Sequence, residues 1–137
     1  MDTQNTKIAF VTDDGATISA HFGRAKYYEI VQVVNGMVTH RERREKAGHH
    51  TFAQTEHHHD HENGQHGFDE ASRAKHTSMI APILDCQMMV TRGMGAGAYH
   101  HLSEANILPI LTGNGTIEEA LKEIINGTIT NHPERLH

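Results

Sequence analysis

The chain of 137 residues lacks tryptophan and has only three tyrosines and four phenylalanines, so aliphatic side chains must fill its core. Its single cysteine, Cys86, excludes an intrachain disulfide and a four-cysteine metal cage within one chain. No apolar run approaches the roughly 18 residues that span a membrane. The polar start is unlike a signal peptide, so we expect a cytoplasmic protein with no membrane partner. A basic excess is also lacking, because the net charge is −5, which argues against a nucleic-acid partner.

Histidine is abundant instead, with 14 residues, seven of them between positions 49 and 66. The low-complexity segment 46–69 is long for a loop in a compact domain, which indicates a functional or disordered segment. Imidazole and nearby carboxylates suit divalent nickel, zinc or copper, although this spacing fits many ligand subsets. A solvated loop that binds metal only adventitiously would have the same composition. The candidate divalent-metal ligands are His57, His58, His59, Asp60, His61 and His66.

Three strands are predicted before the histidine-rich segment. Residues 7–12 and 27–34 are apolar runs rich in β-formers, and residues 37–45 become charged, as on an exposed edge. Asn35-Gly36 is a strong hairpin signal, because a type I′ turn needs positive φ at both positions. The three strands are therefore predicted to form an antiparallel meander.

Helices and strands alternate after the histidine-rich segment. The last helix is the clearest, because a capping box at Thr116–Glu119 precedes an apolar stripe and Asn126-Gly127 provides a stop. The expected elements are a helix from about residue 70 that Pro82 kinks or delays, a strand at 87–91, a helix to about residue 105, a strand at 107–112 and the last helix.

Helices between successive strands imply right-handed parallel crossovers. We therefore expect one three-layer α/β domain over residues 1–127, built on a five-stranded mixed sheet with an antiparallel second strand, and a polar tail at 128–137. Pro109 favours an edge position for the fifth strand. The loops after strands one, three and four leave the same edge, where open α/β sheets bind ligands.

A glycine-rich turn at 92–98 (RGMGAGA) follows the fourth strand and opens a helix. It fits a dinucleotide fingerprint formally, but the next strand ends without a carboxylate for a ribose. Backbone N–H groups at a helix N-terminus favour an anion; close packing of the helix on the sheet explains the glycines equally well. Met94 is the one methionine placed to present a soft sulfur, whereas Cys86 is most simply a small buried hydrophobe. His21, in the loop after the first strand, is by itself most simply a hydrogen-bonded loop residue.

Four motifs are Lys7–Gly15 (KIAFVTDDG), Ser19–Ala25 (SAHFGRA), Asp85-Cys86 and Arg92–Ala98 (RGMGAGA). In this order they resemble the dinitrogenase iron–molybdenum cofactor biosynthesis family. This NifX-like group also includes the C-terminal part of NifB proteins and the small molybdenum–copper orange protein. The resemblance covers about residues 7–127. It implies a ribonuclease-H-like fold with strand order 3-2-1-4-5 and the binding or transfer of anionic metal–sulfur clusters.

The resemblance also implies site residues. His21 is the expected cluster ligand, and the turn from Gly93 through Gly95 to Gly97 is the expected backbone cradle. Arg24 and Arg92 can add cationic donors at the rim, and Met94 can add a soft contact. Because the chain has a single cysteine, a cluster would be held by histidine and backbone N–H groups or shared between chains.

We expect a carrier and not an enzyme, since no activated nucleophile stands beside a base in the sequence. A nuclease of this fold would need clustered carboxylates, which the strand at 87–91 does not offer. The expected partners are proteins that donate and accept the cluster, and the expected state is a monomer or weak homodimer. The alternative function is storage or delivery of nickel, zinc or copper by the histidine-rich segment.

Overall fold

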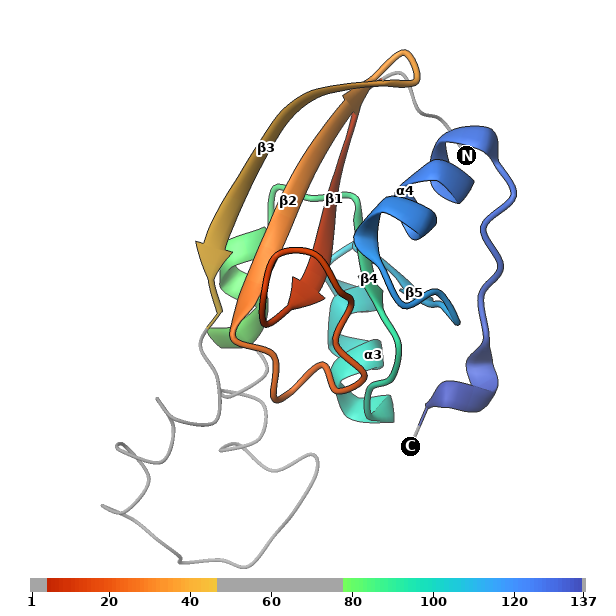
Figure 1. The fold of residues 1–137 in the computed structure, drawn as a ribbon. Coiled ribbons are helices and arrows are strands. Elements are labelled where there is room, and N and C mark those ends of the chain that lie inside the picture. Colours follow the sequence, from red (N-terminus) through yellow and green to blue (C-terminus); the bar gives the residue numbers. More distant parts are fainter. Residues whose placement is uncertain (1–4, 47–77, 137) are drawn as a thin grey trace, which may run out of the picture.

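The computed structural model describes residues 5–46 and 78–136, and its strands form one mixed sheet (Figure 1). The strand order is β3-β2-β1-β4-β5. β2 is antiparallel to β1 and β3, whereas β4 is parallel to β1 and β5, which confirms the predicted mixed sheet. β5 lies at the edge, as Pro109 indicated. The strands are β1 Asn5–Thr12, β2 Tyr27–Val34, β3 Met37–Glu45, β4 Met88–Thr91 and β5 Leu108–Leu111.

The hairpin between β2 and β3 has the predicted geometry. Asn35 and Gly36 both adopt positive φ, at 52° and 79°, as a type I′ turn requires. The register of β2 against β3 shifts between Gln32 and Val33. β3 is exposed along most of its length, as its charged sequence predicted.

Helices cover both faces of the sheet, giving three layers (Figure 1). Side chains of β3 reach both layers, since residues an odd number apart on a strand point to opposite faces. Arg41 binds Glu118 of α4, whereas Arg44 binds the carbonyl of Pro82 in the 3-10 turn η1. The described helical elements are η1 Ala81–Ile83, α3 Ala96–Glu104, α4 Ile117–Asn126 and the 3-10 turn η2 Pro133–Arg135.

The helix expected from about residue 70 lies largely outside the described residues. Its described end, residues 78–80, is helical and continues into η1, where Pro82 occupies the 3-10 turn. α4 begins as predicted, because the Thr116 hydroxyl accepts a hydrogen bond of 3.2 Å from the Glu119 amide. It ends at Gly127, whose φ of 75° is left-handed.

The core is aliphatic, as the composition required, with Phe10 and Tyr28 as its largest fully buried side chains. The hydroxyl group of Tyr28 is buried together with its ring and therefore needs a hydrogen-bond partner. It donates a hydrogen bond to the Met79 carbonyl at 2.6 Å. This bond ties β2 to the helical segment before η1. Other fully buried large side chains are Ile8, Ile18, Ile30, Ile83, Met88, Met89, Met94, Leu102, Ile107 and Leu111.

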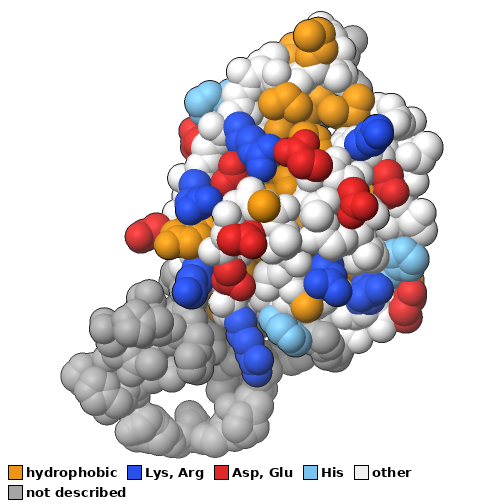
Figure 2. Space-filling view, in the orientation of Figure 1, with side chains coloured by type: hydrophobic (Ala, Val, Ile, Leu, Met, Phe, Trp, Pro, Cys, Tyr) orange, Lys and Arg blue, Asp and Glu red, His pale blue; other side chains and the backbone are white. Residues whose placement is uncertain are grey.

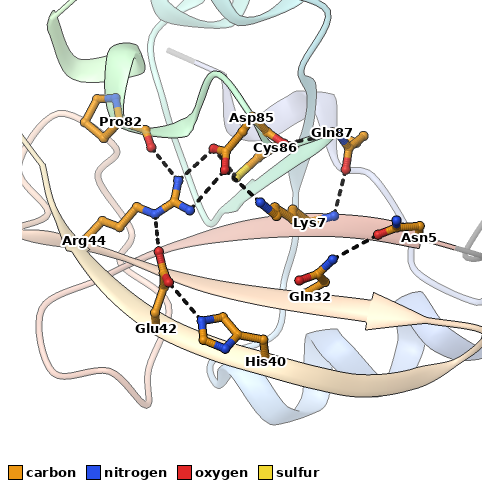
Figure 3. A network of polar contacts seen from close by, with 10 residues as sticks. All are labelled: Asn5, Lys7, Gln32, His40, Glu42, Arg44, Pro82, Asp85, Cys86 and Gln87. Atoms are coloured by element: carbon orange, nitrogen blue, oxygen red, sulfur yellow. Dashed lines mark hydrogen bonds and ion pairs between the residues drawn. The ribbon is translucent and has the colours of Figure 1, made fainter.

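A network of charged side chains joins β1, β3 and the segment before β4 (Figure 3). Asp85 accepts both Nη atoms of Arg44, at 2.7 and 3.1 Å, and the Lys7 ammonium at 3.0 Å. Arg44 also binds Glu42, which contacts His40. The Arg44 guanidinium, with the help of Lys7, holds the pKa of Asp85 well below its usual range.

The segment after α4 turns back along β5 (Figure 1). The amide of Leu111 donates to the Asn131 side chain at 2.9 Å, and the carbonyl of Leu111 accepts from the His132 amide at 2.7 Å. Further on, Leu136 forms a parallel bridge with Met94 in the glycine turn. Sequence analysis treated residues 128–137 as a polar tail, whereas the described part of this segment is docked on the sheet edge.

Candidate functional site

The candidate site lies where β1, β4 and β5 end, and each of these strands ends at or just before a buried threonine. The Thr12 hydroxyl accepts the Gly15 amide at 2.9 Å. The Thr91 hydroxyl donates to the Gly93 carbonyl at 2.9 Å, and the Thr112 hydroxyl accepts the Asn114 amide at 3.0 Å. Each threonine therefore satisfies a backbone group of its own turn and fixes the course of the loop that follows.

Backbone hydrogen bonds join the loop after β1 to the glycine turn after β4. The Phe22 amide donates to the Gly93 carbonyl at 3.0 Å, and the Arg92 amide donates to the Ser19 carbonyl at 3.1 Å. These two bonds bring the sequence neighbours of His21 against the start of the glycine turn. The two loops whose convergence the strand directions predicted are thus in direct contact.

His21 is exposed but stands on an anchored backbone. Its amide donates to the Ser19 hydroxyl at 3.1 Å, and its carbonyl accepts the amides of Arg24 and Ala25. The next residue, Phe22, is buried. The imidazole is therefore attached to a tight turn, and the buried ring of the next residue, Phe22, anchors this turn in the core.

The N-terminus of α3 has no side-chain cap. Gly95 is the N-cap residue, and the first turn contains no acidic side chain. The first amides of a helix lack intrahelical acceptors, and the helix dipole adds partial positive charge there. A Cβ built on Gly95 would meet no atom within 4 Å, so the space in front of this helix end is open. Gly97 lies in the same first turn.

Neither of the soft donors considered in the sequence lies at the surface of this region. Met94 is 1% exposed and belongs to the core cluster, so its sulfur does not extend from the turn as expected. Leu136, whose backbone bridges that of Met94, packs against the same cluster. Cys86 precedes β4 and so lies at the opposite end of that strand from Gly93. It is buried, and desolvation raises the pKa of its thiol to about 12. Its interpretation as a buried hydrophobe is confirmed.

Three arginines at this edge have no carboxylate partner within the part of the chain that the structure describes: Arg24, Arg92 and Arg135. In contrast, all the arginines of β3 form ion pairs. Sequence analysis considered Arg24 and Arg92 but missed Arg135, which reaches this region only through the docking of the C-terminal segment. The apolar residues Ile129 and Leu136, both packed against the core, are the sequence signal that could have indicated this docking.

The proposed divalent-metal ligands His57, His58, His59, Asp60, His61 and His66 lie outside the described residues. Within residues 5–46 and 78–136, no group of three or more His, Cys, Asp or Glu side chains could hold a metal ion. The histidine-rich site therefore remains a prediction from sequence. No helix in these two ranges is long and apolar enough to cross a bilayer.

The fold and this edge define a small α/β domain that presents one imidazole, uncapped helix amides and unpaired arginines beside the ends of its parallel strands. The family model described as dinitrogenase iron-molybdenum cofactor matches residues 4–127, and the chain belongs to this family. Family membership confirms the resemblance found in the sequence and associates the chain coarsely with an accessory role in metallocluster chemistry. A comparison with curated proteins finds no significant match.

Solved structures share the fold. The crystal structure of PH0822 is 20% identical with a TM-score of 0.62, covering 93% of this chain and 96% of that chain. A "putative dinitrogenase" from Methanocaldococcus jannaschii is 16% identical with a TM-score of 0.62, covering 94% and 96%. The apo form of the orange protein from Desulfovibrio gigas is 17% identical with a TM-score of 0.61, covering 96% and 95%. At these identities the likeness supports the five-stranded α/β fold and is compatible with a ribonuclease-H-like description.

Proposed function

We propose that this chain is a non-enzymatic accessory protein that binds or transfers an anionic metal–sulfur cluster. The cluster would lie between His21 and the glycine turn from Gly93 to Gly97. The observation that carries the proposal is the hydrogen bond from the Phe22 amide to the Gly93 carbonyl, which joins the loop that contains His21 to the glycine turn before the uncapped helix α3. Proteins that donate and accept the cluster would be its partners, with the carrier acting as a monomer or weak homodimer.

Local charge favours an anion although the chain carries a net charge of −5. The amides at the start of α3 are hydrogen-bond donors without a capping side chain. Arg24 and Arg92 add guanidinium groups that no described carboxylate neutralises. Sulfide atoms of a cluster are weak acceptors, and several N–H donors at a helix N-terminus suit them.

The ligand chemistry follows from what the chain can offer. His21 supplies an imidazole, a ligand type that suits iron, copper and zinc. Cys86 is the one cysteine of the sequence, and its burial and raised pKa keep it from acting as a thiolate at neutral pH. Backbone amides and guanidinium groups would therefore make most of the contacts that bind the cluster. This kind of binding suits a cluster that must later be released.

Anaerobic reconstitution tests this proposal. The protein is mixed with tetrathiomolybdate or an iron–sulfur cluster, desalted, and examined by visible absorption and metal analysis. We expect His21→Ala to lose most of the bound cluster. His100→Ala is the matched control, since His100 is also exposed but pairs with Glu104 within α3. Equal loading of the His21→Ala variant and the parent would show that the assigned ligand is wrong.

Gly95→Leu tests the helix end separately. The backbone of Gly95, at φ −80° and ψ 157°, is allowed for any residue, and its Cβ would meet open space, so the variant should fold normally. A leucine side chain would occupy the space before the α3 amides and reduce cluster loading. If neither His21→Ala nor Gly95→Leu changes the loading, the whole site assignment fails.

A second function rests on the histidine-rich segment, which is suited to storing or delivering nickel, zinc or copper. Deletion of residues 57–66 distinguishes the two functions. A divalent-metal store loses its binding capacity on this deletion and keeps it when His21 is substituted. A cluster carrier keeps its cluster loading on this deletion and loses it when His21 is substituted.

A further inference from the structure

Two buried guanidinium nitrogens lack acceptors at the carboxyl ends of β4 and β5. The Nε atoms of Arg92 and Arg135 are the buried side-chain nitrogens without a hydrogen-bond partner among the described residues. Buried donors are nearly always paired in native proteins, because an unpaired one loses its hydration without compensation. Both arginines are only partly exposed, so these side chains are confined and do not extend freely into solvent.

Backbone contacts bring together the segments that carry the two arginines. The Thr112 amide donates to the Thr91 carbonyl at 2.9 Å, so the next residues, Arg92 and Gly113, leave neighbouring strands side by side. A Cβ on Gly113 would lie 3.6 Å from Nη2 of Arg135. Leu136 bridges Met94, two residues beyond Arg92. Figure 2 shows that basic, acidic and histidine side chains are interspersed on this face of the molecule.

We propose that Arg92 and Arg135 form a binding site for a small tetrahedral dianion of the phosphate or molybdate class. Two guanidinium groups repel each other unless an anion lies between them, and each presents N–H donors in a planar fork that matches two oxygens of an oxyanion. Only Nε is buried and unpartnered in each group, so the Nη atoms remain available to a ligand.

One carboxylate lies near the pair. Glu134 forms an ion pair of 2.9 Å with Nδ1 of His132, and hydrogen bonds to its own backbone and to His132, with the charges of His132 and Arg135, lower its pKa. The Nε2 atom of His132 lies 3.8 Å from a Cβ built on Gly113, on the side where Arg135 lies. The His132 ring therefore lies beside Arg135 at the end of β5.

The site shares Arg92 with the proposed cluster site, but Arg135 completes it and His21 takes no part in it. Arg135 and His132 lie beyond residue 127, where the match to the family model ends. The inference does not depend on cluster binding, and its failure would leave the assignment of His21 unaffected.

Nuclear magnetic resonance of the arginine Nε–Hε groups tests the proposal. The uniformly 15N-labelled full chain is titrated with sodium phosphate and, separately, with sodium molybdate, while sodium chloride keeps the ionic strength constant. We expect saturable chemical-shift changes of the Arg92 and Arg135 signals with at least one oxyanion. The oxyanion that binds with the higher affinity identifies the ligand size that the site prefers. Shifts that do not saturate, or that chloride reproduces, would overturn the site.

Variants give a second, independent readout. Arg92→Gln and Arg135→Gln should each weaken binding about tenfold or more, as the loss of a charge-assisted hydrogen bond implies. Gly113→Asp places a carboxylate beside Arg135 and should abolish binding, whereas the isosteric Gly113→Asn should retain it. Lys122→Gln, the same loss of charge on an exposed position of α4, is the control. Unchanged affinity in Arg135→Gln and in Gly113→Asp would refute the proposal.

Discussion

The amide of Phe22 donates to the carbonyl of Gly93 at 3.0 Å, and this one bond couples the loop after β1 to the loop after β4. Phe22 is 2% exposed, and the Lys46 ammonium lies 4.7 Å from the centre of its ring. The residue next to the exposed His21 is therefore fixed by a hydrogen bond, by burial and by a cation–π contact. The backbone position of His21 relative to the glycine turn is therefore set by contacts of the folded core.

Phe22→Ala should destabilise the protein by about 3 kcal/mol, because it removes a buried aromatic ring and leaves a cavity. Chemical denaturation measures this change. Phe22→Leu, which keeps an apolar side chain, should cost clearly less. The alanine variant should also bind less cluster while His21 is still present, since the loop loses its anchor. A cost below about 1 kcal/mol would mean that the ring contributes little to the core.

Tyr28→Phe should destabilise the protein by about 1–2 kcal/mol, since it leaves the buried Met79 carbonyl without its donor. The comparison is Tyr27→Phe, one residue earlier on β2. Tyr27 is only partly buried and contacts Arg43 through its ring face, which phenylalanine preserves. Equal stabilities of the two variants in urea denaturation would contradict the assigned role of the Tyr28 hydroxyl.

Asp85→Asn removes the charge at the centre of the network in Figure 3 and should lower the free energy of unfolding by about 0.5–1 kcal/mol at neutral pH. The value is small because the carboxylate is 44% exposed and screened by solvent. The folded-state pKa of Asp85 is lowered, so its contribution is present above the ordinary value of 3.8 and is lost as the pH falls through the lower folded value. The parent should therefore lose stability below about pH 4 more steeply than the variant. Denaturation at pH 7 and pH 3 measures the difference, and parallel losses would show that Asp85 is not the titrating group.

The Cys86 thiol should react slowly in the native protein. Its pKa is raised to about 12 by burial, and the thiolate is the reactive form. We expect alkylation by iodoacetamide at pH 8 to be at least about a hundredfold slower in buffer than in denaturant, as the raised pKa implies. Cys86→Ser provides the background, since the chain has no other cysteine. Comparable rates in both solvents would show that the thiol is accessible.

The histidine-rich segment should bind Ni²⁺ or Zn²⁺ at micromolar concentration or tighter when its imidazoles are neutral. Binding should weaken below about pH 6, because protons compete for the ring nitrogens, whose ordinary pKa is about 6.5. Calorimetry of the parent and of a variant lacking residues 57–66 at pH 7.5 and pH 5 provides the measurement. Undiminished binding of the parent at pH 5 would argue against histidine ligation.

Most of the strand layout followed from local patterns. Asn35-Gly36 defined the hairpin because few other residues accept two positive φ values, and Thr116–Glu119 defined the start of α4 because the capping bond is local. Alternation of helices and strands then determined which strands run parallel. Each of these signals depends on residues close together in the sequence, which is why they could be interpreted without a structure.

Contacts between distant segments were not predictable in the same way. The glycine pattern located the turn at Met94 but could not show that its side chain is buried, since depth depends on Leu136 and the core below. The bonds from Arg44 to Asp85 depend on the width of the sheet between β3 and the segment before β4. Arg135 enters the site only because Asn131 and His132 bind the backbone of β5.

The contacts of Leu111 also decide how copies of this domain can associate. Within the described residues, Asn131 and His132 occupy both backbone groups of Leu111, and Pro109 has no amide to donate. A foreign strand therefore finds no continuous row of free donors and acceptors along β5. β3, the opposite edge, carries arginines and glutamates that discourage an uncharged strand. Addition of a further strand is thus hindered at the β5 edge by the hydrogen bonds to Leu111, and at the β3 edge by charged side chains.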